Sequence, residues 1–232
     1  MRTDYLTILF CLLTMNVSFS CCHNGDSIDE ESNGNNGAYG FCPDDNHPHK
    51  IDLRLPSGTK WSCCNVGANT PEEHGGFFAW GEVKEKSSYS RENYEYDNSY
   101  EAGFEYIGDD IAGTIYDVAY VNSKGKWRMP SLEQVTELII ICDWEWRAIN
   151  GVNGQLVIGP NGNTIFLPAS GWHWDNSFQG KEEEGFYFTS TLSSYNDEAL
   201  VRACGLEFNS KEVKPDNYLD RSAGCTVRPV CP

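Results

Sequence analysis

The sequence predicts an α+β fold built around an antiparallel sheet, and three observations lead to this class. Apolar and polar residues alternate early in the chain, at residues 51–55, as in a half-buried strand. One amphipathic helix follows at residues 131–142, and a hairpin and several short strands come after it. Strands grouped before and after a helix, without regular alternation of the two, are typical of α+β proteins.

The first half of the folded part is predicted to be strands and loops. Residues 51–55 place three apolar side chains on one strand face, and Pro-Ser-Gly at residues 56–58 indicates a turn. Residues 60–66 are predicted to form a second strand. Residues 87–100 are polar and tyrosine-rich without a helical period, which indicates a long surface loop, and residues 117–122 are predicted to form a short helix.

The helix at residues 131–142 has the clearest local signal. Ser131 follows Pro130 and precedes Gln134 by three residues, the spacing of a capping box that satisfies backbone N–H groups at a helix start. Beyond the helix, the Asn161-Gly162 step between two apolar runs indicates a β-hairpin. The remaining predicted strands are residues 185–191, 199–208 and 225–230.

The composition indicates an exported globular protein. The chain has 232 residues, of which 40% are hydrophobic, with seven tryptophans, so it can bury a core. Its formal net charge of −17 repels phosphate backbones and anionic lipids, which argues against nucleic acid or a bare membrane surface as partner. Ten cysteines are many for a reducing compartment and favour an oxidising one.

The N-terminus is predicted to direct export and lipid anchoring. Residues 1–20 resemble a secretory signal peptide, with an apolar stretch at residues 5–17 that is too short to span a bilayer. Ser18 and Ser20 lead to Cys21 as in a bacterial lipobox, although Ser18 stands where leucine is usual. Lipidation of Cys21 at the outer membrane or cell surface is predicted, with ordinary cleavage before Cys21 as the alternative.

A polar segment follows the predicted anchor. Residues 23–40 contain almost no apolar side chain that could pack, so residues 21–46 are predicted to be an acidic flexible tether. Its acidic residues, Asp26, Asp29, Glu30 and Glu31, resemble the surface-export signal of some lipoproteins. A solvated linker without such a signal is the alternative. Residues 47–232 are then the folded domain.

The cysteine spacing does not decide how the cysteines pair. Chain order alone leaves many connectivities open, and Cys63 and Cys64, adjacent on a predicted strand, are expected to point to opposite faces. No Cys-x-x-Cys pair occurs in the sequence, so no zinc ribbon is predicted. The pairs predicted here are Cys64 with Cys142, Cys204 with Cys225, and Cys42 with Cys231.

His47-Pro48-His49, near Asp44 and Asp45, has residue types that metals use. The segment lies where the tether meets the domain. We therefore predict a solvated loop there and no metal site.

Seven sequence runs, in order, resemble one protein family. They are residues 52–61 (Asp-Leu-Arg-Leu-Pro-Ser-Gly-Thr-Lys-Trp), 65–68 (Asn-Val-Gly-Ala), 78–82 (Phe-Ala-Trp-Gly-Glu), 127–131 (Trp-Arg-Met-Pro-Ser), 150–154 (Asn-Gly-Val-Asn-Gly), 162–169 (Gly-Asn-Thr-Ile-Phe-Leu-Pro-Ala) and 227–230 (Val-Arg-Pro-Val). Together they resemble the Fibrobacter succinogenes major paralogous domain, found in secreted or surface bacterial proteins, over about residues 50–230.

The resemblance implies a C-type-lectin-like fold, which is shared with formylglycine-generating enzymes. It implies a twisted antiparallel sheet, short flanking helices, neighbouring termini, and long loops that carry ligand binding. The chain departs from the family in two ways. Residues 187–190 are Tyr-Phe-Thr-Ser where the family has Tyr-Trp-Ser-Ser. Four cysteines are additions relative to the family pattern: Cys63, Cys204, Cys225 and Cys231.

The sequence predicts no enzyme. Formylglycine-generating chemistry needs two closely spaced reactive cysteines before the last arginine-containing strand, and Cys225 and Cys231 flank that strand instead. Gly-x-Ser-x-Gly, His-Glu-x-x-His and phosphate-binding loop motifs are absent from the sequence. A carboxylate pair for glycoside hydrolysis leaves no sequence signature, so that chemistry stays open.

The residues predicted to contact a ligand fall into two groups. Trp172, Trp174, Asp175 and Asn176 combine flat aromatic faces with amide and carboxylate groups, which suits sugar rings. Calcium could use such oxygens, but the usual calcium motifs of lectins, Glu-Pro-Asn and Trp-Asn-Asp, are absent. No cofactor is therefore predicted, with calcium left open, and burial of one tryptophan in the core is the alternative.

The second group lies in residues 213–221, just before the last strand. In the resembling fold this region belongs to the exposed binding face, and tyrosine, asparagine and arginine suit recognition surfaces. The predicted contacts are Asp216, Asn217, Tyr218 and Arg221, with a polar hairpin that binds nothing as the alternative. Trp61, Trp80, Trp127 and Arg128 are assigned to structure.

These features predict a non-catalytic surface lipoprotein that binds a glycan or a protein ligand, as an adhesin or accessory binding module. A structural subunit of a surface appendage or envelope complex is the alternative. An extracellular hydrolase is less favoured.

Overall fold

The computed structural model describes residues 46–98, 103–194 and 200–231. These residues all belong to one compact unit that spans residues 38–232. The predicted signal peptide, Cys21, Cys42 and the tether up to residue 45 lie outside the described residues. Within the described part, no helix is long and apolar enough to cross a membrane.

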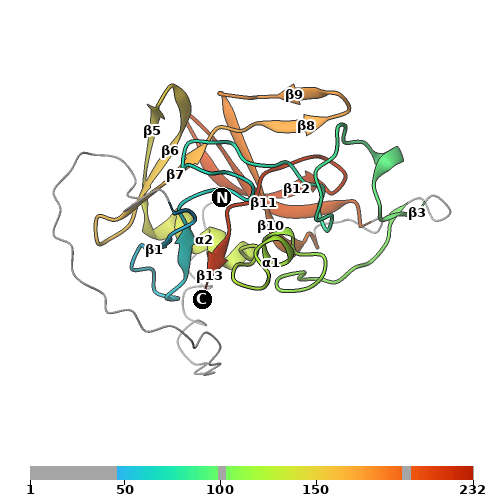
Figure 1. Ribbon diagram of the computed structural model, residues 1–232, viewed down its shortest axis with the longest axis horizontal. Helices are drawn as coiled ribbons and strands as arrows, with labels where there is room; N and C mark the ends of the chain where they lie inside the picture. Colours follow the sequence, from blue (N-terminus) through green and yellow to red (C-terminus); the bar gives the residue numbers. More distant parts are fainter. Residues whose placement is uncertain (1–45, 99–102, 195–199, 232) are drawn as a thin grey trace, which may run out of the picture. The chain divides into compact units, whose positions relative to one another are not determined.

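The described strands form several small antiparallel sheets, with few helices, as Figure 1 shows. This agrees with the predicted α+β class and its antiparallel pairing. The strands lie in three three-stranded sheets and two two-stranded pairs in the described residues, rather than in one continuous sheet. The smallest pair is β3 (Asp97–Asn98) with β4 (Gly103–Phe104).

The first sheet joins the two ends of the described chain. Its order is β1-β2-β13, so β2 (Lys60–Ser62) lies between β1 (Lys50–Asp52) and β13 (Val230–Cys231). Trp61 of β2 stands opposite both Ile51 and Val230 and is buried. The predicted strands at residues 51–55 and 60–66 are thus present but shorter than expected, whereas β13 overlaps the strand predicted at residues 225–230 only at Val230.

The second sheet confirms the predicted hairpin. β6 (Val152–Ile158) pairs with β7 (Thr164–Pro168) across the Asn161-Gly162 turn. β5 (Asp143–Ile149) pairs with the other edge of β6 and was not predicted. Its alternating Asp-Trp-Glu-Trp sequence carries the strand signal.

The helices begin where the sequence predicts. In α2 (Leu132–Ile141), the Ser131 N–H donates to Gln134 Oε1 at 2.9 Å, and the Gln134 N–H donates to Ser131 Oγ at 3.3 Å. This confirms the capping box. The short α1 (Val118–Asn122) is capped by Asp117, and burial raises the pKa of that carboxyl group. In the described part of the loop predicted at residues 87–100, the 3₁₀ turn η2 (Arg91–Asn93) and β3 interrupt the irregular chain.

The third sheet separates the two larger core clusters. It contains β10 (Glu184–Leu192), β11 (Arg202–Asn209) and β12 (Val213–Asp220). Tyr187 packs into one cluster and its neighbour Phe188 into the other, because successive strand residues point to opposite faces. Most of the region in which the sequence predicted the second group of ligand contacts is thus the edge strand β12.

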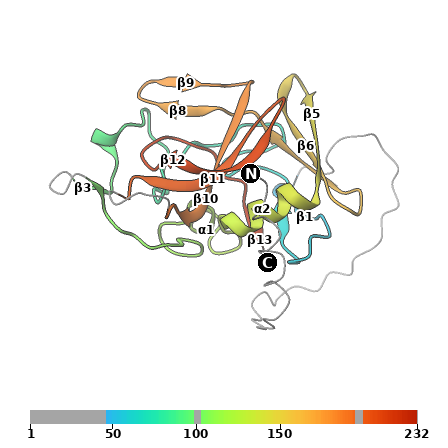
Figure 2. The same cartoon turned by 180° about the vertical axis from the view of Figure 1, so that it is seen from behind.

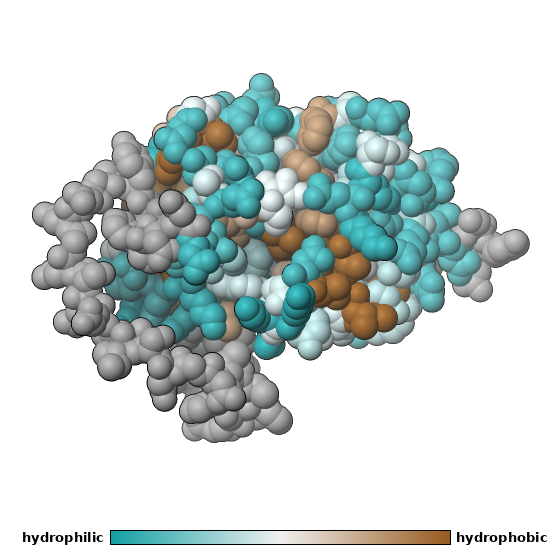
Figure 3. Space-filling view, in the orientation of Figure 1, coloured by the Kyte–Doolittle hydropathy of each residue, from teal (hydrophilic) through white to brown (hydrophobic). Residues whose placement is uncertain are grey.

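The residues assigned to structure are mostly in the core. Trp61, Trp80 and Trp127 are buried, as predicted. Arg128 has an exposed side chain, and its backbone pairs with Val230. On the face shown in Figure 3 hydrophilic residues predominate and hydrophobic ones gather in limited areas, in keeping with the net charge of −17.

Candidate functional site

The predicted tryptophan group lies on a hairpin that the sequence did not reveal. β8 (Trp172–Trp174) pairs with β9 (Ser177–Gln179), and Figures 1 and 2 show this hairpin beside the β10-β11-β12 sheet. Trp172 stands opposite Gln179 and Trp174 opposite Ser177. Because side chains alternate along a strand, the two tryptophans share one face of the hairpin.

Both tryptophans are partly buried. The Trp172 and Trp174 ring centroids lie 6.1 Å apart, with the planes tilted by 52°. The Trp172 ring lies 6.3 Å from the ring of Phe186 on β10, and all three pack against the second core cluster. Packing on one side fixes the rings, while the remaining surface stays accessible to a ligand.

Charged side chains continue this face across the neighbouring sheet. Phe186 stands opposite Glu207, and Glu207 opposite Lys214, so their side chains lie on the same face. Lys214 Nζ lies 3.3 Å from Glu207 Oε1, and this hydrogen bond and charge raise the pKa of the Lys214 ammonium group. Asp216 comes two residues later on β12 and faces the same way.

We call this surface the tryptophan face. It consists of Trp172, Trp174, Phe186, Glu207, Lys214 and Asp216. The flat rings can stack on an apolar patch of a ligand. The carboxylate and ammonium groups beside them can form hydrogen bonds with polar groups around that patch.

The hairpin tip is fixed to a neighbouring loop. The Asp175 N–H donates to the Tyr89 carbonyl oxygen at 2.6 Å, and the Tyr89 N–H donates to the Asp175 carbonyl oxygen at 3.1 Å. The Tyr89 hydroxyl donates to the carbonyl oxygen of Phe77, and burial raises the pKa of Tyr89 to about 12. Asp175 and Asn176 therefore present exposed side chains from an anchored turn.

The opposite face of the hairpin is a packing surface. The His173 and Phe178 rings stack with centroids 4.4 Å apart and planes 2° from parallel. The His173 backbone forms two hydrogen bonds with Gly224, and burial lowers the pKa of the His173 imidazole. A neutral, stacked histidine here positions the hairpin.

We expect Gly171→Ala to weaken this hairpin. Gly171 has φ +65°, and an added Cβ would lie 2.1 Å from the carbonyl oxygen of Gln179. The strain and clash should lower the free energy of unfolding by about 2 kcal/mol, measured by urea denaturation. Gly162→Ala is the matched control, because Gly162 has φ +82° but open space around it. Equal losses in the two variants would contradict this packing.

The second predicted group does not stay together. Tyr218 is 55% exposed and Asp216 is partly exposed, while the Asn217 side chain lies outside the described part. Arg221 is fully buried, with its guanidinium 4.7 Å from the Trp80 ring centroid. The prediction that Arg221 contacts a ligand is therefore wrong. The chain turns into the core after β12, and backbone carbonyls hold the charge there.

Two predicted disulfides are also wrong. Cys142 and Cys225 carry no disulfide, which removes the pairs Cys64–Cys142 and Cys204–Cys225. Cys142 instead caps α2, and burial raises its pKa to about 11. Cys225 packs in the second core cluster, where burial strongly raises its pKa. The pair Cys42–Cys231 involves a residue outside the described range.

The expectation that Cys63 and Cys64 point to opposite faces of a strand is also wrong. β2 ends at Ser62, and a bend follows, so strand alternation does not extend to this pair. Their Sγ atoms lie 3.4 Å apart rather than on opposite faces. Together with His47 they form the one close group of metal-ligand side chains found in the described residues.

The tryptophan face joins residues from two sheets into a surface with rigid rings and charged partners. Sequence reasoning found its tryptophans and Asp216 from residue type. It missed Phe186, Glu207 and Lys214, which only strand register brings to this face. Comparison of the chain with models of protein families, with curated proteins and with solved structures gave no match.

Proposed function

We propose that this protein binds a glycan or protein ligand through the tryptophan face, without converting it. The observation that carries the proposal is the pair of partly buried tryptophans beside a charged strand face. Aromatic side chains held by packing lose little conformational freedom on binding, and they contribute much of the affinity at recognition surfaces.

The proposal includes a C-type-lectin-like domain of the major paralogous type, exported and lipid-anchored at Cys21. The seven sequence runs support the family, and the lipobox-like segment supports the anchor. Pairing of β1 and β13 with the same strand supports the fold, because neighbouring termini are part of that expectation.

A binding screen tests the proposal. The full chain would be screened against immobilised polysaccharides and surface proteins, with calcium and with a chelator. We expect Trp172→Ala and Trp174→Ala to weaken binding at least tenfold, about 1.4 kcal/mol or more. Trp146→Ala is the matched control, because Trp146 is also partly buried but packs against the other core cluster. Loss of binding under chelation would assign calcium to the site.

Three outcomes would contradict the proposal. Equal binding by all three variants and the parent would place the contact elsewhere. Release of ligand fragments that stops when one carboxylate is replaced would indicate a hydrolase. Retention of no ligand, together with self-assembly of the chain, would favour the structural-subunit alternative.

A further inference from the structure

Three side chains with nitrogen or sulfur donors, those of His47, Cys63 and Cys64, meet at one end of the β1–β2 ladder, and His49 lies beside Cys63. Lys50 stands opposite Ser62 at this end, and the Cys63 N–H donates to the His49 carbonyl oxygen at 3.1 Å. The ladder thus continues one step, and it places the His47-Pro48-His49 segment beside Cys63-Cys64. The fold itself brings the two pairs together.

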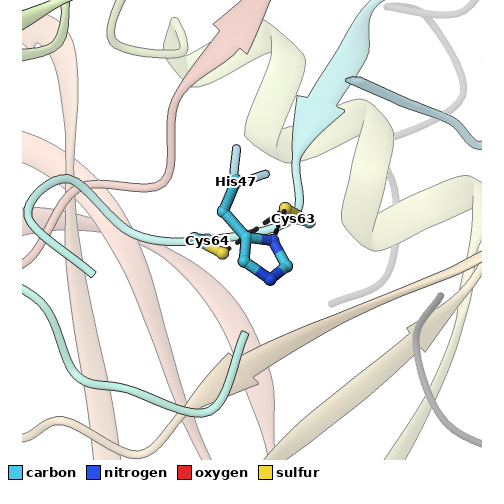
Figure 4. A group of neighbouring side chains, drawn as sticks. All are labelled: His47, Cys63 and Cys64. Atoms are coloured by element: carbon cyan, nitrogen blue, oxygen red, sulfur yellow. Dashed lines mark hydrogen bonds between the residues drawn. The ribbon is translucent and has the colours of Figure 1, made fainter. Parts of the chain in front are cut away.

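The distances among three of these donors are close to those around a tetrahedral metal. His47 Nδ1 lies 3.3 Å from Cys63 Sγ, and Cys63 Sγ lies 3.4 Å from Cys64 Sγ. Figure 4 shows these three side chains together, and their ligand atoms all lie within 4.8 Å of one another. His49 Nδ1 lies 3.8 Å from Cys63 Sγ, but His49 does not belong to this group. Bonds of about 2.3 Å to sulfur and about 2.1 Å to nitrogen give tetrahedral edges of about 3.4–3.8 Å between ligand atoms.

The surroundings leave access for an ion and supply one hydrogen-bond donor to sulfur. Both cysteines are buried, at 3% and 1% exposure, while His47 and His49 are partly exposed and leave a route for an ion. The His49 backbone N–H donates to Cys63 Sγ at 3.0 Å. A donor to sulfur stabilises the charged form and orients it, as outer-shell groups do in metal sites.

We propose that Cys63, Cys64 and His47 bind one Zn²⁺ ion, and that water or the His49 imidazole, after rotation, completes the tetrahedron. Two sulfur ligands and one imidazole ligand select zinc over calcium or magnesium, which take oxygen. Binding by these three residues forms two Zn–S bonds and one Zn–N bond, and the two thiol protons leave to solvent without electron transfer. The ion fastens the segment before β1 to the bend after β2. This site is separate from the tryptophan face and does not depend on the proposed function.

Metal analysis of the full chain, purified without reductant or chelator and dialysed against Zn²⁺, tests the site. We expect about one zinc per chain and, after exchange with Co²⁺, the thiolate-to-cobalt charge-transfer absorption of a tetrahedral site. Cys63→Ser and Cys64→Ser should each weaken zinc binding more than tenfold, and His47→Gln about tenfold. Zinc affinity should rise with pH, because thiol protons compete with the ion.

Cys142→Ser is the matched control, a buried cysteine outside the group, and should leave zinc binding unchanged. Peptide mapping that finds Cys63 or Cys64 in a disulfide would overturn the proposal, as would zinc retention by both serine variants. Where a serine variant unfolds, His47→Gln decides, because it keeps both sulfurs; unchanged zinc affinity in it would also overturn the proposal.

Discussion

Replacing Arg228 by methionine is expected to lower the free energy of unfolding by about 3–5 kcal/mol. Arg228 is 1% exposed. Its Nε donates to Asn65 Oδ1 at 2.8 Å, and its two terminal nitrogens donate to the carbonyl oxygens of Ser62 at 3.1 Å and Phe166 at 2.6 Å. Methionine fills much of the volume but leaves three buried acceptors without their donor.

The loss should be large because Arg228 joins separate sheets. Ser62 ends β2 and Phe166 lies in β7, while Asn65 also donates to the hydroxyl of Tyr187 on β10 at 3.3 Å. No carboxylate among the described residues pairs with this guanidinium, so carbonyl dipoles and the amide hold its charge.

Urea denaturation of Arg228→Met beside Arg54→Met measures the effect. The Arg54 side chain is 74% exposed, so its replacement should change the free energy of unfolding by only about 0.5 kcal/mol. Similar losses in the two variants would contradict the role assigned to Arg228.

Arg221→Met is expected to lower the free energy of unfolding by about 3 kcal/mol. Its Nη1 and Nη2 donate to the carbonyl oxygens of Leu200 at 2.7 Å and Glu105 at 3.0 Å. Its Nε donates to the Tyr94 hydroxyl at 3.1 Å, and its charge lies against the Trp80 ring. Calorimetric or urea unfolding gives the loss directly.

The same variant separates a structural role from a binding role. Because Arg221 has no exposed surface, the folded fraction of Arg221→Met should bind ligand with the parent's dissociation constant. A larger dissociation constant with an unchanged melting temperature would show that Arg221 takes part in binding.

Local signals predicted the elements that local interactions stabilise. The capping box of α2 needs only Ser131 and Gln134, and the β6–β7 hairpin needs a short turn, so both could be found from the sequence. β12 contains Pro215 and several polar residues that indicate a loop, yet pairing with β11 holds it as an edge strand, where proline is tolerated. The turn between β11 and β12 is only three residues long, so the pairing is local, but the polar sequence of β12 does not reveal it.

The candidate site was predicted only where residue type is enough. Trp172 and Trp174 suit recognition wherever they are accessible, but Arg221 shows that a charge does not guarantee exposure when buried carbonyls accept it. The predicted cysteine pairs were wrong because the spacing of cysteines along the chain does not encode which sulfur atoms meet. The His47–Cys63 contact likewise depends on the register of the β1–β2 ladder.

Hydrogen exchange with and without bound ligand tests the central claim, that ligand binds the tryptophan face. The probe would be the polysaccharide or protein retained most strongly in the screen. We expect slower backbone exchange at residues 172–176, 184–186 and 214–216 in the complex, and no such change for Trp174→Ala. Protection confined to other segments, such as α2, with these three unchanged would contradict the claim.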